Sequence, residues 1–388
     1  QLIIGYFFSQ YFYFLIFDNN LYKELLFISI IGQGICFVNT LHMNYFRVNG
    51  KVIKFFILSI LNFSLSLVLT FLLFKYYETS ISVPIYTILI VNILLFLILL
   101  IVNSKNLSIH SISLPEVKRI FLFGFPFVLS SIFIMLGEWG DKILISKFLS
   151  KSELADFSML IKISSLYTFI VALPFSLIWH PLILPILKHD KKDIIFDSVF
   201  TIFFCVSFSF LVGFTLFILP LLEILNFNNQ YFYIIKLCPF ILLGNIFVSS
   251  LEFFSIGLIY SNRKNLLPFL YLISGLISIG ISYSLISYGL IYLIIYYPVI
   301  RFISILLIYK FGKFHTNSFK MNKIITITSI LVLIIIYISN LELFTNNQIS
   351  LLFDFILFLF FLLFCIKLCL PQIVLLTKQN NFPKLKSE

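Results

Sequence analysis

Long apolar runs joined by short polar segments make up most of this sequence, and this pattern leaves few folds open to it. A helix needs about 20 apolar residues to cross the hydrocarbon core of a bilayer. The runs here are long and continuous, unlike the alternating short strands of a membrane barrel. Hydrophobic residues make up 61% of the 388 residues and charged residues only 11%, so we expect no sizeable soluble domain. We predict an all-α, polytopic transmembrane protein.

We expect about twelve membrane spans along the chain. They cover residues 2–17, 22–45, 53–75, 83–102, 119–147, 153–184, 195–219, 232–260, 265–287, 289–311, 323–339 and 350–376. The sequence starts with Gln1 inside an apolar run. We therefore expect an N-terminally truncated chain that holds about 12 of about 14 helices.

Basic residues are distributed unevenly between the two sets of loops. Every second loop, beginning after residue 45, together with the C-terminal tail, holds 18 lysines and arginines, whereas the other loops hold Lys23, Lys75, Lys147 and Lys151. The positive-inside rule places the first set and the C-terminus in the cytoplasm. The net charge of +11 then reflects these loops and their contact with anionic lipid headgroups. No nucleic-acid-binding motif is present, so we expect no nucleic-acid partner.

A weak internal repeat suggests two related helical bundles. Residues 45–67 and 258–280 both contain a helix end, a short basic turn and a helix carrying small polar residues, and two homologous bundles are a common plan in transporters. We predict four regions: the remainder of an N-terminal bundle at 1–103, a cytoplasmic linker at 104–118, a C-terminal six-helix bundle at 119–312, and two additional helices with a cytoplasmic tail at 313–388.

The motifs of soluble enzymes are missing from the sequence. No phosphate-binding glycine loop, HExxH sequence or nucleophile elbow appears, and the 16 acidic residues form no obvious acid/base pair. The cysteines lie in apolar runs and no set of residues has the spacing of a metal site. We therefore expect neither an enzyme nor a metal protein.

Ionisable side chains inside the predicted spans are the most informative residues, because each costs a few kcal/mol unless it faces protein or water. Glu138 lies about 15 Å from the outer end of its helix, and Lys162 lies about as deep on the next, antiparallel helix. We predict that they belong to one charged cluster in an interior cavity. Arg301 is more central, about 18 Å deep. The candidates that we retain are Glu138, Asp141, Lys142, Lys162, Glu252 and Arg301.

A purely structural role is the alternative for part of this set. Asp141 and Lys142 are close enough to the outer interface for their charged ends to reach it. Glu138 and Lys142 are four residues apart on one helix face and can form an ion pair that only holds helices together. The sequence leaves both interpretations open.

Several motifs follow one another in order between residues 123 and 185. They are FGFP at 123–126, the acidic-basic pair Asp141 and Lys142, KFL at 147–149, Lys162 in mid-helix and WHP at 179–181, and a basic FRVNGK turn lies at 46–51. In this pattern the chain resembles bacterial polysaccharide flippases, the O-antigen and capsule repeat-unit translocases of the multidrug/oligosaccharidyl-lipid/polysaccharide exporter superfamily. It departs from them at Glu138, Trp139 and Gly140, where the family often has small polar residues.

The resemblance implies two six-helix bundles around a central cavity, as in multidrug exporters of the MATE type, with two extra C-terminal helices. It implies a multi-pass protein of the bacterial cytoplasmic membrane that moves undecaprenyl-pyrophosphate-linked oligosaccharide from the inner to the outer leaflet. Surface polysaccharide, such as the O-antigen of lipopolysaccharide, or capsule would be the product. Alternating access would drive this flippase.

The same resemblance suggests roles for the charged residues. Lys162, Arg301 and Lys142 would contact the anionic headgroup. The acidic residues would balance charge or bind a coupling H⁺ or Na⁺, and these are Glu138, Asp141 and Glu252. No other cofactor is expected. The expected partners are the lipid-linked substrate, membrane lipid, and polysaccharide polymerase and chain-length proteins.

Three other classes remain as alternatives. A drug or cation antiporter of the same fold would rely on acidic and aromatic cavity groups, whereas this chain has several cationic ones. A membrane polysaccharide polymerase usually needs a sizeable outward loop. A non-transporting scaffold would not need charges at matched depth.

Overall fold

The computed structural model describes residues 22–49, 51–76, 82–103, 113–188, 192–224, 232–259 and 264–311, together with 359–374 except 360, 364 and 372. Within these ranges all regular structure is helical. Nine helical stretches among the described residues are long and apolar enough to cross a membrane. The chain is a multi-pass, all-helical membrane protein, as predicted. It divides into two compact units between Ser113 and Leu114.

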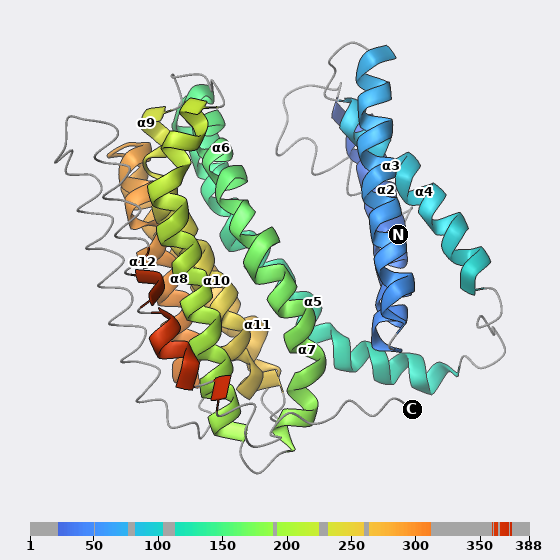
Figure 1. Ribbon diagram of the computed structural model, residues 1–388. Helices are drawn as coiled ribbons and strands as arrows, with labels where there is room; N and C mark the ends of the chain where they lie inside the picture. Colours follow the sequence, from blue (N-terminus) through green and yellow to red (C-terminus); the bar gives the residue numbers. More distant parts are fainter. Residues whose placement is uncertain are drawn as a thin grey trace. The chain divides into compact units, whose positions relative to one another are not determined.

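The first unit contains three described helices, α2 (Tyr22–Val48), α3 (Val52–Tyr76) and α4 (Ser82–Asn103), drawn in blue to cyan in Figure 1. The closest packing is between α2 and α4. There the side-chain amide of Asn39 donates a hydrogen bond of 2.9 Å to the backbone oxygen of Asn92. Such a bond between helices suits a membrane interior, where water offers no alternative partner.

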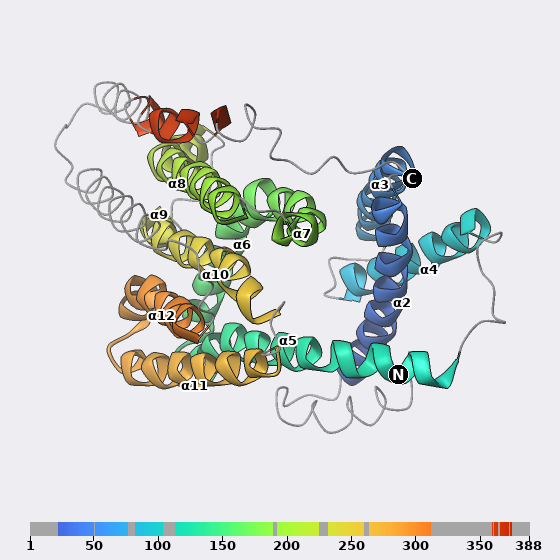
Figure 2. The same cartoon turned by 90° about the horizontal axis from the view of Figure 1, so that it is seen from below.

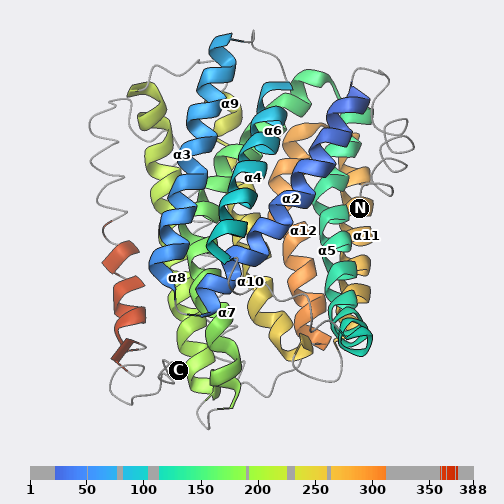
Figure 3. The ribbon, with the colours of Figure 1, turned by 90° about the vertical axis from the view of Figure 1, so that its right-hand side faces the viewer.

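The second unit holds the remaining long helices. They are α5 (Leu114–Phe148), α6 (Lys151–Tyr167), the π-helix η3 (Thr168–Ala172), α7 (Leu173–Leu187), α8 (Lys192–Ile224), α9 (Phe232–Ile235), α10 (Cys238–Ile259), α11 (Leu266–Ile286) and α12 (Leu290–Phe311). Helix α11 packs along α5, and α10 packs along α12. Figures 2 and 3 show α5 and α11 side by side.

Most predicted spans in the described ranges agree with these helices, with one correction. The span predicted at 232–260 is interrupted, because α9 ends at Ile235 and α10 begins only at Cys238. Pro239 explains the break, since it has no N–H to donate to the carbonyl of Ile235, the last residue of α9. The spans predicted at 2–17 and 323–339, and most of 350–376, lie outside the described residues.

Helices α6, η3 and α7 form one continuous helix with a π-helical turn inside it. Ser150 caps its start: its hydroxyl accepts from the backbone N–H of Glu153, whose carboxylate accepts from the backbone N–H of Ser150. At the π-helical turn, the N–H of Leu173 donates to the carbonyl of Thr168, five residues earlier. Pro174 follows at once and has no N–H to give to the preceding turn. The wider turn therefore occurs where the α-helical bonding pattern is broken.

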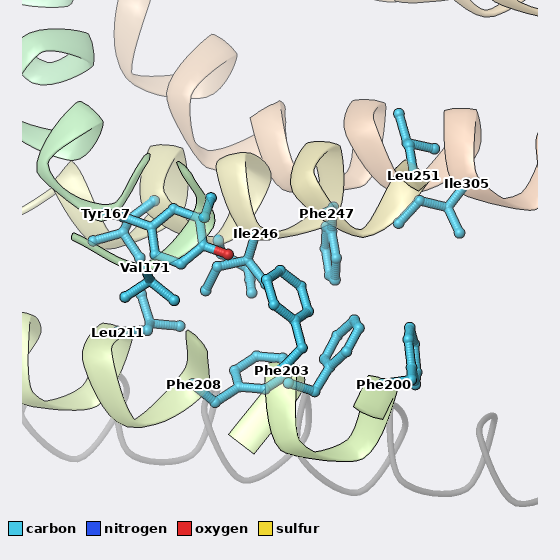
Figure 4. Close-up of a cluster of buried hydrophobic side chains, with 14 of the residues drawn as sticks. Tyr167, Val171, Phe200, Phe203, Phe208, Leu211, Ile246, Phe247, Leu251 and Ile305 are labelled. Carbon is cyan, nitrogen blue, oxygen red and sulfur yellow. The ribbon is translucent and has the colours of Figure 1, made fainter. Parts of the chain in front are cut away.

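Aromatic side chains from α8 fill the core of the second unit. Figure 4 shows Phe203 and Phe208 of α8 in one cluster with Ile246 of α10, and Tyr167 lies next to Ile246. The Tyr167 hydroxyl lies 3.0 Å from that of Ser207 on α8 and so keeps a hydrogen-bond partner inside the core. This packing fixes the end of α6 just before the π-helical turn.

Candidate functional site

Arg301 of α12 and Asp141 of α5 form an ion pair in the interior of the second unit. The Nη2 atom of Arg301 lies 3.0 Å from the Oδ2 atom of Asp141. The other carboxylate oxygen accepts a 2.7 Å hydrogen bond from the hydroxyl of Ser282 on α11. Both charged residues are buried, with 5% and 0% of their surface exposed. One carboxylate therefore joins three helices.

Glycines allow these helices to approach closely. Gly137 on α5 faces Gly275 on α11, and a Cβ atom on Gly137 would lie only 3.5 Å from the Cα of Gly275. Small residues at such contacts let helix backbones pack closely in membranes. On the other side of Arg301, the ring of Tyr297 lies 4.6 Å from the guanidinium carbon. That ring packs directly against Gly244 of α10.

The geometry makes the Arg301–Asp141 pair a connection between helices. Two buried charges that bind each other offset part of the desolvation cost that each would have alone. The guanidinium faces Asp141, the carbonyl oxygen of Gly137 at 3.5 Å, and the Tyr297 ring. Because both residues are buried, the helices around the pair would have to open before Arg301 could bind a headgroup or Asp141 a coupling ion.

Glu138, Lys142 and Lys162 lie on the outside of the same unit. Glu138 and Lys162 are exposed and Lys142 is half-buried. The ammonium of Lys142 lies 4.6 Å from the centre of the Trp139 ring, a cation–π contact. Among the described residues, Glu138 forms no ion pair with Lys142 or with Lys162. The predicted cluster therefore lacks its central ion pairs, because Lys142 stacks on Trp139 and the other two side chains point outward.

Glu252 of α10 belongs to a second polar group with two residues of α7. Its carboxylate oxygens accept hydrogen bonds of 2.8 and 2.9 Å from the hydroxyl of Ser176. The Nε2 atom of His180 lies 3.9 Å from the same carboxylate. Ser176 and His180 are one helical turn apart, just after the π-helical turn. This group combines a carboxylate, a hydroxyl and an imidazole, which are suitable ligands for a proton or a small cation.

The sequence analysis missed several polar partners in both groups. Ser282 is the most important, and a signal for it exists, because Ser274, Ser278 and Ser282 recur every four residues along α11. All three are buried, as a row of small residues on one helix face predicts for a close helix contact. Ser176 and His180 also share one face of α7, but nothing in the sequence connects them with Glu252.

Comparison with known proteins gives one structural likeness. No protein-family model matches this chain, and the comparison with curated proteins gave no match. Among solved structures, the chain is similar to one described as lipid II flippase MurJ in an inward closed conformation. The TM-score is 0.66 at 18% sequence identity, over 96% of this chain and 81% of that one. At this identity the likeness concerns the fold alone, which is polytopic and helical.

Proposed function

We propose that this protein is a flippase that moves undecaprenyl-pyrophosphate-linked oligosaccharide repeat units from the inner to the outer leaflet of a bacterial cytoplasmic membrane. The fold likeness to a protein named as a lipid II flippase carries this proposal. A multi-pass helical fold of this type suits alternating access, in which packed helical units change position around a substrate. The proposed products are surface polysaccharides such as O-antigen or capsule.

Lys162 and Lys142 are the proposed contacts for the pyrophosphate. Both lie within apolar helices. The side chain of Lys162 is exposed, whereas that of Lys142 is half-buried and has no acidic partner among the described residues. A cation at this depth is stable where it meets water or an anion. The role that we propose for Arg301 is to hold helices in position and not to bind the headgroup, because its guanidinium donates to Asp141. Glu138 is exposed and lies four residues before Lys142, and its proposed role is to balance charge on this surface.

Glu252 is the proposed group for a coupling H⁺ or Na⁺. Its carboxylate is one-third exposed and has Ser176 and His180 as neighbours. The sequence offered two other candidates for this role. Asp141 is neutralised by Arg301, and Glu138 is assigned to charge balance. A drug or cation antiporter is the second candidate function, because a partly open carboxylate inside a membrane helix also suits a cationic substrate.

The direct test uses the full chain, purified and reconstituted in liposomes. A fluorescent undecaprenyl-pyrophosphate-linked oligosaccharide is placed in both leaflets, and a membrane-impermeant reductant reports how fast the inner pool reaches the outer leaflet. We expect rapid exchange with the intact protein and at least a tenfold slower rate for Lys162→Gln and Lys142→Gln. Lys147→Gln, at the exposed end of α5, is the matched control and should keep the full rate.

Two outcomes would count against the proposal. No exchange by the intact protein, with either an H⁺ or an Na⁺ gradient applied, would reject the flippase function. Gradient-driven accumulation of the cationic dye ethidium, without movement of the lipid-linked substrate, would instead support the antiporter. Full rates in both lysine variants would reject only the assignment of the headgroup contacts.

A further inference from the structure

Helix α5 is too long for a single span, and its first turns lie at an angle to the rest. Its 35 residues correspond to about 52 Å of helix, against about 30 Å of hydrocarbon core. In Figures 1 and 3 the start of α5 turns away from the direction of the remaining helix. Pro126 lies inside α5, and a proline there removes one backbone hydrogen bond and causes a kink. The segment before Pro126 therefore suits the membrane interface.

A basic pocket of about 890 Å³ lies beside this first segment. Three cationic side chains line it, Lys118 and Arg119 of α5 and Lys264 just before α11, together with the carboxylate of Glu116. The ammonium of Lys264 lies 4.3 Å from the centre of the Phe123 ring. Within the part of the chain that the structure describes, neither Lys118 nor Arg119 has an ion-pair partner. The pocket therefore has a surplus of positive charge available to an anion.

An apolar groove of about 570 Å³ continues from this pocket between α5 and α11. Leu122 lines both spaces. The walls of the groove include Phe125 and Phe269, whose side chains are 46% and 58% exposed. The groove reaches as far as Phe133, seven residues beyond the kink at Pro126, so it extends about 10 Å along the remaining helix. That is less than half of the hydrocarbon core, so the groove stays within one leaflet.

We propose that the basic pocket and the apolar groove together bind one anionic phospholipid of the surrounding bilayer. The lipid phosphate contacts Lys118, Arg119 and Lys264, and one acyl chain lies in the groove between α5 and α11. Basic pockets between membrane helices on the cytoplasmic side are suited to anionic lipid headgroups. The positive-inside pattern places this end of α5 in the cytoplasm. The ligand class is therefore a glycerophospholipid with a net negative headgroup.

The length of the groove favours a phospholipid over the lipid-linked substrate. Both molecules have a phosphate and a hydrophobic chain, so both satisfy the basic pocket. A groove that ends within one leaflet matches part of one acyl chain, whereas a polyprenyl chain is several times longer. The site also lies apart from Lys142, Lys162 and Glu252, since none of them lines the pocket or the groove. The inference does not depend on the proposed transport function.

The test measures lipid binding to the full chain in detergent by native mass spectrometry. The probes are dioleoyl phosphatidylglycerol, which is anionic, and dioleoyl phosphatidylcholine, which is neutral overall. We expect phosphatidylglycerol to bind at least tenfold more tightly. The triple variant Lys118→Ala/Arg119→Ala/Lys264→Ala should lose about a hundredfold in phosphatidylglycerol affinity, because each cation near an anionic lipid contributes about a factor of five.

Two further variants separate the headgroup and acyl-chain contributions. Phe269→Ser opens one wall of the groove. It should weaken the binding of both lipids several-fold, and by a similar factor for each. Lys147→Ala/Lys151→Ala removes two cations where α5 ends and α6 begins, and it should leave both affinities unchanged. Equal binding of the two lipids, or unchanged phosphatidylglycerol affinity in the triple variant, would reject the site. Binding of undecaprenyl pyrophosphate, but not phosphatidylglycerol, that depends on the three cations would overturn the proposed phospholipid.

Discussion

The guanidinium of Arg301 and the carboxylate of Asp141 lie 3.0 Å apart inside the second unit, although 160 positions separate them in the sequence. Asp141→Asn or Arg301→Gln alone leaves the other charge buried without its partner. We expect each single variant to lower the free energy of unfolding by about 3–5 kcal/mol. The double variant should lose clearly less than the sum of the two. Denaturation of the full chain in SDS, followed by circular dichroism, measures all four proteins.

Lys162→Gln is the control for this cycle, because Lys162 is exposed and its replacement should change stability by about 0.5 kcal/mol or less. Strictly additive losses in the double variant would show that the two residues do not stabilise the fold through each other. Unchanged stability in Arg301→Gln with a loss of lipid transport would restore the sequence-based prediction that Arg301 contacts the headgroup.

Gly244 should tolerate no side chain, because a Cβ atom there would lie 2.4 Å from a ring carbon of Tyr297. Gly244→Ala is expected to cost about 1–3 kcal/mol through overpacking. It should also disturb the stacking of Tyr297 on Arg301. Gly280→Ala is the matched control, since a Cβ at Gly280 meets no atom within 4 Å. That variant should be neutral or stabilising by up to about 1 kcal/mol. Equal thermal stability of the two variants would contradict the close contact.

Glu252→Gln should remove the dependence of transport on an ion gradient. The carboxylate has a hydroxyl of Ser176 at 2.8 Å and an imidazole of His180 at 3.9 Å. An amide does not exchange a proton near neutral pH and lacks the negative charge that attracts a cation. In the liposome assay the variant should move substrate at one low rate with or without the gradient. Ser176→Ala should keep the dependence but weaken it several-fold, because the carboxylate remains.

Glu24→Gln, at an exposed position in the first turn of α2, controls for loss of one acidic residue and should keep the full gradient response. A normal gradient response in Glu252→Gln would remove Glu252 from the coupling mechanism. The proposed flippase function would survive that result, since another residue would then carry the coupling ion.

The span pattern was predictable from the sequence because it depends on properties of each segment alone. A run of about 20 apolar residues needs a bilayer whatever its neighbours are. The break before Pro239 was harder to predict, since membrane helices often tolerate proline when neighbouring groups satisfy the freed carbonyls. Depth along a helix singled out Arg301, and the structure buries this residue inside the second unit. Depth contains no information on helix rotation, however, so it paired Glu138 with Lys162 and missed the contact between Asp141 and Arg301.

The π-helical turn at Thr168–Ala172 predicts that this helix tolerates a deletion that a regular helix does not. A π-turn contains one more residue than the α-helical turn that it replaces. Deleting Ile170, whose side chain is 60% exposed, should close the turn and keep Tyr167 and Ser176 on their present faces. We expect the free energy of unfolding to change by about 1 kcal/mol or less. Because the regular helix would lack the wider π-helical turn, we expect lipid transport to become slower.

Deletion of Leu276 in α11 is the contrasting variant. Leu276 is also exposed, at 57%, but α11 has no extra residue to absorb the loss. Every residue after the deletion would rotate by about 100° relative to Gly275, so Ser282 would leave Asp141. This variant should lose at least about 3 kcal/mol of stability or fail to fold. Comparable losses of stability in the two deletion variants would contradict this prediction. They would mean that the fold needs the residue that the π-helical turn contains.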